Sequence, residues 1–210
     1  MQYIIKYYTF DHPFSQNKKR MSPRTKEQFK AIRKEKEEVI MQTALRLFAS
    51  KGFEATSVSI IAKEAGISKG LMYNYFKSKE DLLKRVIIGN LSKFLDYLQI
   101  ENPESIQKEE IIQFIDGNLQ QLKKEPDFFK LYFSLAFQPS VFSLLEEDIM
   151  QVFMPLVEVF TNYYAQSGEE QPFVKARFLL AIFDGIGIHY VMDTQSFPLD
   201  ETHDLIINLL

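Results

Sequence analysis

Residues 61–77 read Ile61-Ala62-Lys63-Glu64-Ala65-Gly66-Ile67-Ser68-Lys69-Gly70-Leu71-Met72-Tyr73-Asn74-Tyr75-Phe76-Lys77. Gly66 ends one short helical segment, and Ser68 can cap the next one. Met72 and Phe76 lie four residues apart on that second segment, so both side chains can be buried on one face. A small residue between two short helices lets them cross closely, which predicts a helix-turn-helix.

The other face of the second segment is polar and basic. It carries Lys69, Gly70, Tyr73, Asn74 and Lys77, and no acidic residue occurs between Gly66 and Lys79. A carboxylate on this face would be held against phosphate groups if the face met a nucleic acid. The pattern therefore favours a surface that faces an anionic partner, although basic helical faces are also common on proteins that bind none.

Helical spacing continues on both sides of this segment. Upstream, a helix is expected within residues 32–50, followed by a short one that Thr56 or Ser57 caps. Downstream, a long helix is expected from Lys79 to Ile100. Later helices are bounded by Pro103, Pro126, Pro139, Pro172 and Pro198, and Pro155 should mark a helix start or a kink. No strand pattern is found, so we predict an all-α fold of roughly nine or ten helices.

Charge divides the 210-residue chain into a basic front and an acidic back. Residues 1–85 carry 18 Lys and Arg against 9 Asp and Glu, whereas residues 86–210 carry 7 against 19. The balances of +9 and −12 give the net charge of −3. Such asymmetry indicates a two-part chain in which the front part meets a polyanion. The family resemblance given below implies that these parts are a helix-turn-helix DNA-binding domain over residues 21–77 and a larger helical domain over 78–210. We expect residues 1–20 to be an extension that is either disordered or a helical arm. The extension either lies upstream of a true start at Met21 or is a basic arm that follows the DNA.

Several classes of protein are excluded by what the composition lacks. The chain has no cysteine, and its 3 histidines are far apart, so we expect no metal site and no cofactor. No glycine-rich phosphate loop or Gly-x-Ser-x-Gly motif occurs, so we expect no enzyme. No apolar run reaches the ~20 residues of a membrane helix, and no signal peptide is evident. We expect a cytoplasmic protein that does not enter a membrane.

The chain resembles the TetR family of bacterial transcriptional regulators over about sixty residues from Ile32. The resemblance rests on Gly52-Phe53, Thr56-Ser57-Val58, Ile61-Ala62-Lys63-Glu64-Ala65-Gly66-Ile67-Ser68, Tyr73-Asn74-Tyr75-Phe76 and Lys79-Glu80-Asp81-Leu82. It implies a homodimer in which three N-terminal helices bind DNA and a fourth links them to a small-molecule and dimerisation domain. We therefore expect a repressor that a small, mostly apolar ligand releases from a palindromic operator. The alternative is an all-α interaction protein whose helix-turn-helix binds a protein or an RNA.

The site residues follow from these expectations. Phosphate contacts are assigned to Thr56, Tyr73, Tyr75 and Lys79, and base-edge contacts to Lys69, Gly70, Leu71 and Asn74. Thr56 and Lys79 are placed at helix starts, where anions bind best. The ligand pocket is assigned to Phe114, Phe129, Tyr132, Phe133, Phe137, Phe160, Tyr164 and Phe178, from the aromatic surplus after residue 85. The stretch Ala181-Ile182-Phe183-Asp184-Gly185-Ile186-Gly187 resembles a family dimer helix, so Phe183, Gly187 and Tyr190 are assigned to the dimer interface.

Overall fold

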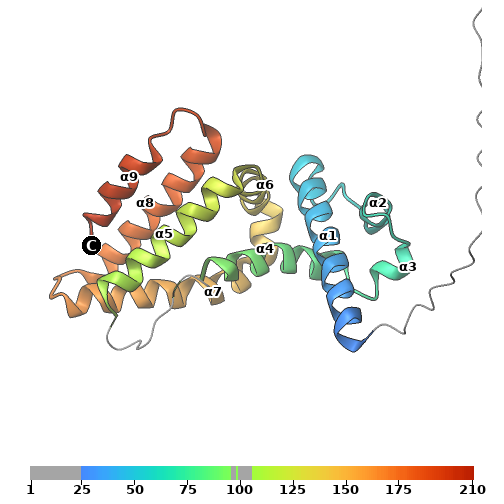
Figure 1. The fold of residues 1–210 in the computed structure, drawn as a ribbon, viewed down its shortest axis with the longest axis horizontal. Helices are drawn as coiled ribbons and strands as arrows, with labels where there is room; N and C mark the ends of the chain where they lie inside the picture. The colour runs from blue at the N-terminus through green and yellow to red at the C-terminus, as the bar shows by residue number, and fades with distance from the viewer. Residues whose placement is uncertain (1–24, 96–97, 99–105) are drawn as a thin grey trace, which may run out of the picture.

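The structure, a computed structural model, describes residues 25–95, 98 and 106–210. Those residues form nine α-helices and no strand, which confirms the all-α prediction (Figure 1). The helices are α1 (Lys26–Lys51), α2 (Val58–Glu64), α3 (Lys69–Met72), α4 (Lys79–Leu95), α5 (Lys108–Lys124), α6 (Pro126–Ala136), α7 (Pro139–Gln166), α8 (Pro172–Met192) and α9 (Leu199–Ile207). The expected extension over residues 1–20, the boundary at Pro103 and the predicted helix end at Ile100 lie outside the described residues.

The first three helices form the predicted helix-turn-helix, with two differences from the sequence expectation. Helix α1 begins at Lys26 instead of Ile32, because Thr25 and Gln28 form a reciprocal capping box. Helix α3 ends at Met72 instead of continuing to Lys77, and a turn follows it. Met72 and Phe76 are nevertheless both buried, as predicted.

Proline sets the starts of the later helices. Helices α6, α7 and α8 each begin at a proline, and Pro198 directly precedes α9. Proline suits the first helical position because its missing N–H is not needed there and its φ is already helical. Pro155 differs from the expectation of a helix start, because it lies inside the 28-residue helix α7.

Two hydrophobic cores organise the described chain. The first packs α1–α4 around Ile40, Phe48 and Phe76, and it also takes in Tyr132 and Leu135 from α6. In Figure 1, α6 lies beside α1. The Gln138 side chain fastens this junction, because its Nε2 donates to the Phe48 carbonyl at 3.2 Å and its Oε1 accepts from the Phe53 N–H at 3.4 Å. The helix-turn-helix is thus packed directly against α6 as well as joined through α4.

The second core lies between α5, α6, α7, α8 and α9. Helices α7 and α8 are neighbours along their length, and α9 packs on α8. The phenol groups of Tyr163 and Tyr164 donate to the carbonyls of Leu210 and Leu209, at 2.8 and 3.0 Å. These bonds fix the end of the chain against α7.

None of the described helices is by itself long and apolar enough to span a membrane. Helices α6 and α7 satisfy the length and composition criteria only as a pair, and the pair is bent by 95°.

Candidate functional site

The helix-turn-helix presents the predicted polar face to solvent. Ser57 and Ser68 cap α2 and α3 by accepting from the N–H groups of Ile60 and Leu71, and Gly66 in the turn has a φ of 68° that favours glycine. Tyr75 is half-buried, whereas the exposed residues from the start of α3 to position 77 are Lys69, Gly70, Leu71, Tyr73, Asn74 and Lys77. Most of the residues assigned to DNA contact therefore share one accessible surface, which we call the recognition surface.

Arg33 of α1 supports this surface, a role that the sequence analysis missed. Its Nη2 donates to the Asn74 carbonyl at 2.7 Å, and its guanidinium lies 5.0 Å from the centre of the Tyr75 ring. The first half of α1 also carries four exposed lysines, at Lys26, Lys30, Lys34 and Lys36. The charge excess of residues 1–85 could have indicated α1, but only the fold places Arg33 against the turn after α3.

Thr56 does not belong to the recognition surface. Its side chain is 0% exposed, and its hydroxyl donates to the Gly52 carbonyl at 2.8 Å. The prediction of a phosphate contact from this side chain is therefore wrong, because the hydroxyl closes the loop between α1 and α2. Ser57 occupies the N-cap position instead.

The ammonium of Lys79 contacts the loop between α1 and α2, although its side chain is only half-buried. Its Nζ donates to the Phe53 carbonyl at 3.0 Å and lies 4.1 Å from the centre of the Phe53 ring. The side chain therefore ties the start of α4 to the loop before α2, which is a cation–π contact as well as a hydrogen bond. The phosphate contact assigned to Lys79 stays a prediction.

An apolar cavity of about 110 Å³ lies between α4, α5, α6, α7 and α8. Of the eight aromatic residues assigned to a ligand pocket, Phe114, Tyr132 and Phe133 line it. Leu91, Phe94, Asn118, Leu180 and Gly187 also contribute to its walls. This apolar cavity is smaller than the 300–1,000 Å³ typical of ligand pockets, so it holds a ring or a short chain as it stands.

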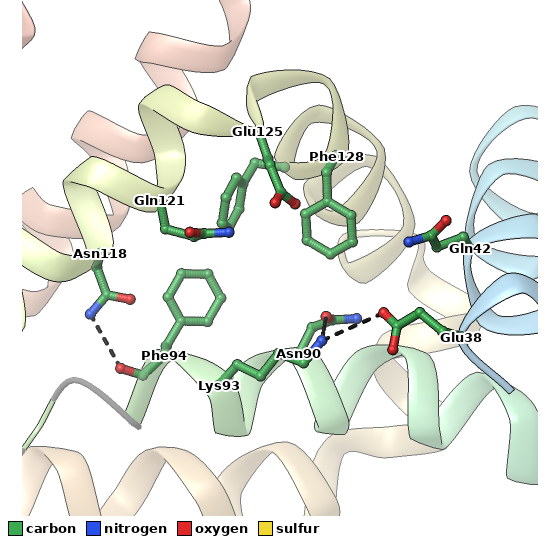
Figure 2. Close-up of a pocket in the computed structure, with 10 residues that line it drawn as sticks. Glu38, Gln42, Asn90, Lys93, Phe94, Asn118, Gln121, Glu125 and Phe128 are labelled. Carbon is green, nitrogen blue, oxygen red and sulfur yellow. Dashed lines mark hydrogen bonds and ion pairs between the residues drawn. The ribbon is translucent and has the colours of Figure 1, made fainter. Parts of the chain in front are cut away.

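A second cavity, about 320 Å³, lies where the helix-turn-helix meets the rest of the chain (Figure 2). We call it the junction cavity. Its walls come from α1, α4, α5 and α6 and from Glu125, which lies between α5 and α6. The predicted pocket residue Phe129 is one of the lining residues. Phe94 and Asn118 line both cavities, so they form the partition between them.

The remaining four predicted pocket residues line neither cavity. Phe160 is buried against the Phe114 ring, at 5.7 Å between centroids, and Tyr164 holds the chain end. Phe137 and Phe178 are 64% and 56% exposed. Helical spacing could not separate these roles, because it predicts which side chains are buried but not which side chains or cavities they contact.

The residues assigned to the dimer interface mostly face the interior of the same chain. Phe183 and Gly187 line the apolar cavity, and a Cβ built on Gly187 would lie 3.5 Å from the Phe133 ring. Tyr190 packs edge-on against Phe197, at 6.4 Å between centroids. The close approach that Gly187 permits is therefore to α6, and the prediction of a partner helix at this glycine is wrong.

Asp184 lies at the rim of the apolar cavity, where part of its side chain stays in water. Burial among apolar neighbours raises the pKa of its carboxyl to about 6, and the nearby Arg177 opposes the shift. The ionised carboxylate is therefore less stable in the folded chain than in the unfolded chain. Among the described residues no group of three or more potential metal ligands is found.

We expect Asp184→Asn to raise the free energy of unfolding above pH 6. The gain should shrink as the pH falls toward 4, because the wild-type carboxyl then becomes protonated in the folded state. We expect no more than about 1 kcal/mol at pH 8, since the exposed part of the side chain is screened. Urea unfolding at pH 5 and pH 8 measures the difference, with Glu158→Gln on the exposed face of α7 as the control. An equal gain at both pH values would contradict this assignment.

The fold and the recognition surface define a helix-turn-helix protein with a helical second domain, and comparisons specify the family. Residues 40–86 match the family model described as bacterial regulatory proteins, tetR family. The uncharacterized HTH-type transcriptional regulator YuxN of Bacillus subtilis is 64% identical over 50 residues, which cover 24% of this chain and only 17% of YuxN. Residues 40–86 therefore form the helix-turn-helix of a TetR-family transcriptional regulator.

Two further comparisons extend beyond the helix-turn-helix. The fatty acid metabolism regulator protein of Bacillus subtilis is 23% identical over 177 residues, which cover 81% of this chain and 91% of that protein. The solved structure of the transcriptional regulator FadR from Bacillus subtilis in complex with stearoyl-CoA has a TM-score of 0.64 at 23% identity. The matched region covers 82% of this chain and 96% of the FadR chain, which establishes the shared fold across both domains.

Proposed function

We propose that the protein is a DNA-binding repressor that reads a palindromic operator. The observation that carries this proposal is the recognition surface, where Lys69, Leu71 and Asn74 are exposed on one face and held in place by Arg33. Lysine can bond guanine, asparagine can bond adenine, and leucine can contact a thymine methyl group. The exposed phenol of Tyr73 and the lysines of α1 are suited to phosphates. The half-buried Tyr75 and Lys79 are proposed as further phosphate contacts.

The proposed repressor acts as a homodimer through the exposed apolar faces of α7 and α8. Met154 on α7 and Val174 and Phe178 on α8 are about half exposed, although their side chains are large and apolar. Surfaces of this kind indicate a protein interface, and a two-fold pair would bury the same faces of both subunits. Each subunit then reads one half-site, with the centres about one helical turn apart or a multiple of it.

The proposed effector is a small, mostly apolar molecule that enters the apolar cavity and lowers the affinity for DNA. The related FadR structure contains stearoyl-CoA, which makes a long-chain acyl-CoA the first compound to test. A cavity of about 110 Å³ holds only part of such a chain, so the apolar cavity has to widen for the chain to enter. A tenfold loss of operator affinity requires that the effector favour the released state by about 1.4 kcal/mol.

Genomic capture tests the proposal directly. Fragmented DNA of the source genome is passed over the immobilised protein, and the retained fragments are sequenced. We expect a palindromic site to be enriched, and a band-shift assay with that duplex to show release by stearoyl-CoA or another apolar compound. If the protein prefers neither a sequence nor a duplex over RNA at moderate salt, the interaction-protein alternative gains.

A further inference from the structure

The junction cavity contains a buried amide that lacks a partner on one side. Asn118 is only 2% exposed, and its Nδ2 donates to the carbonyls of Phe94 and Phe114 at 3.2 and 2.8 Å. Because two acceptors lie on the Nδ2 side, the amide cannot be reversed, and Oδ1 must point the other way. Figure 2 shows this oxygen facing into the cavity, and it has no hydrogen-bond partner among the described residues. A buried acceptor of this kind calls for a donor from outside the chain.

The charged groups around the cavity favour a positive ligand. Its walls carry the carboxylates of Glu38 and Glu125 and one ammonium, that of Lys93, which leaves a formal charge of −1. Lys93 forms an ion pair with Glu38, with 3.9 Å between the Lys93 Nζ and the Glu38 Oε1. In Figure 2 the Glu125 carboxylate points into the cavity. Glu125 is exposed to water, and no ion pair joins its carboxylate to another residue of the described ranges. An incoming cation therefore finds one uncompensated carboxylate.

Aromatic rings supply the rest of the lining. Phe94, Phe128 and Phe129 surround the same space, with centroid separations of 5.5 Å between Phe94 and Phe129 and 5.3 Å between Phe128 and Phe129. The face of an aromatic ring attracts a cation and also accepts an apolar group. Carboxylate, amide oxygen and rings together match an ammonium that carries an apolar substituent.

We propose that the junction cavity is a binding site for an organic ammonium ion. Its N–H groups donate to the Asn118 Oδ1 and to the Glu125 carboxylate, and its apolar part lies against Phe94 and Phe128. The site differs from the apolar cavity in charge and in its walls, since Glu38 and Gln42 come from α1. A ligand bound there contacts the helix-turn-helix and the second domain at once. The proposal does not depend on the identity of the operator or of the apolar effector.

Calorimetry on the full chain without DNA tests the site with benzylammonium as the probe. Benzyl alcohol has the same ring without the charge, and benzoate reverses the charge. We expect benzylammonium to bind at least about tenfold more tightly than benzyl alcohol, and benzoate not to bind, because charge-assisted hydrogen bonds are the stronger ones. Equal binding of the cation and the alcohol would overturn the proposal.

Substitutions then locate the bound cation. Glu125→Gln should weaken benzylammonium binding about tenfold and leave benzyl alcohol unchanged, whereas Glu147→Gln on the exposed face of α7 should have no effect. Asn118→Leu should weaken benzylammonium but not benzyltrimethylammonium, which has no N–H to donate. Because Asn118 is buried, circular dichroism must show that the Asn118→Leu variant is folded. If that variant does not fold, Glu38→Gln on α1 serves as the second test. Benzylammonium affinity that none of these substitutions lowers would place the cation elsewhere and contradict the site.

Discussion

Gly187→Leu should remove the apolar cavity and leave the assembly of the protein intact. A Cβ at this position makes an ordinary contact with the Phe133 ring, so the added isobutyl group has to extend into the 110 Å³ space that the cavity provides. Xenon binds dry apolar cavities, so xenon NMR should detect a saturable site in the wild type and none in the variant. Operator binding should persist, and release by an apolar effector should be lost. Overpacking should cost about 1–3 kcal/mol of stability.

Gly185→Leu is the matched control for this prediction. Gly185 lies on the same helix, and a Cβ built on it meets no atom within 4 Å, so the same substitution adds the same group outside the cavity. Its xenon site should match that of the wild type. Sedimentation separates the two interpretations of Gly187. If Gly187→Leu produced monomers, the glycine would face a partner subunit and the assignment to the cavity would be wrong.

Much of the fold could be predicted from the sequence because local chemistry fixes it. The Ser68 cap acts through its own side-chain oxygen, and glycine in a turn and proline at a helix start act through their own backbone geometry. Gly66, Ser68, Pro126 and Pro139 therefore marked real boundaries. Thr56 and Ser57 both carry a hydroxyl that can cap the N-terminus of a helix. Only the path of the loop decides that the Thr56 hydroxyl turns inward to Gly52.

The cavities could be predicted only in part, because helical spacing gives the buried face of a helix and not what it meets. Phe114 and Phe160 are equally buried, yet only Phe114 borders a cavity. One feature of the sequence, the polar residue Asn118, could have indicated the site. Asn118 stands where the spacing from Phe114 to Leu122 on α5 requires an apolar residue, and a polar group in that position indicates either a hydrogen-bonded core or a site. The charge excess of residues 1–85 similarly could not single out Arg33, whose role depends on the contact between α1 and the turn after α3.

Asn74→Ala should relax the preference of the protein at a single base pair. The exposed amide has the geometry to pair with one adenine, so discrimination at that position should fall by roughly 1–3 kcal/mol, which is about 5- to 150-fold in relative affinity. Discrimination at the other positions should be unchanged, because the Arg33 bond reaches the Asn74 backbone and survives the substitution. Competition against single-base operator variants measures each position separately.

Tyr73→Phe gives the contrasting result that makes this prediction specific. The Tyr73 side chain is 50% exposed, and the substitution removes only the phenol hydroxyl, so the proposed phosphate contact should be lost while the ring remains. Because phosphate contacts carry no sequence information, this variant should bind every operator variant more weakly by the same factor. If Asn74→Ala instead lowered the affinity for all operators equally, Asn74 would contact the backbone and another residue of the recognition surface, Lys69 or Leu71, would read the bases. The helix-turn-helix would then still bind DNA, but with a different division between positioning and sequence readout.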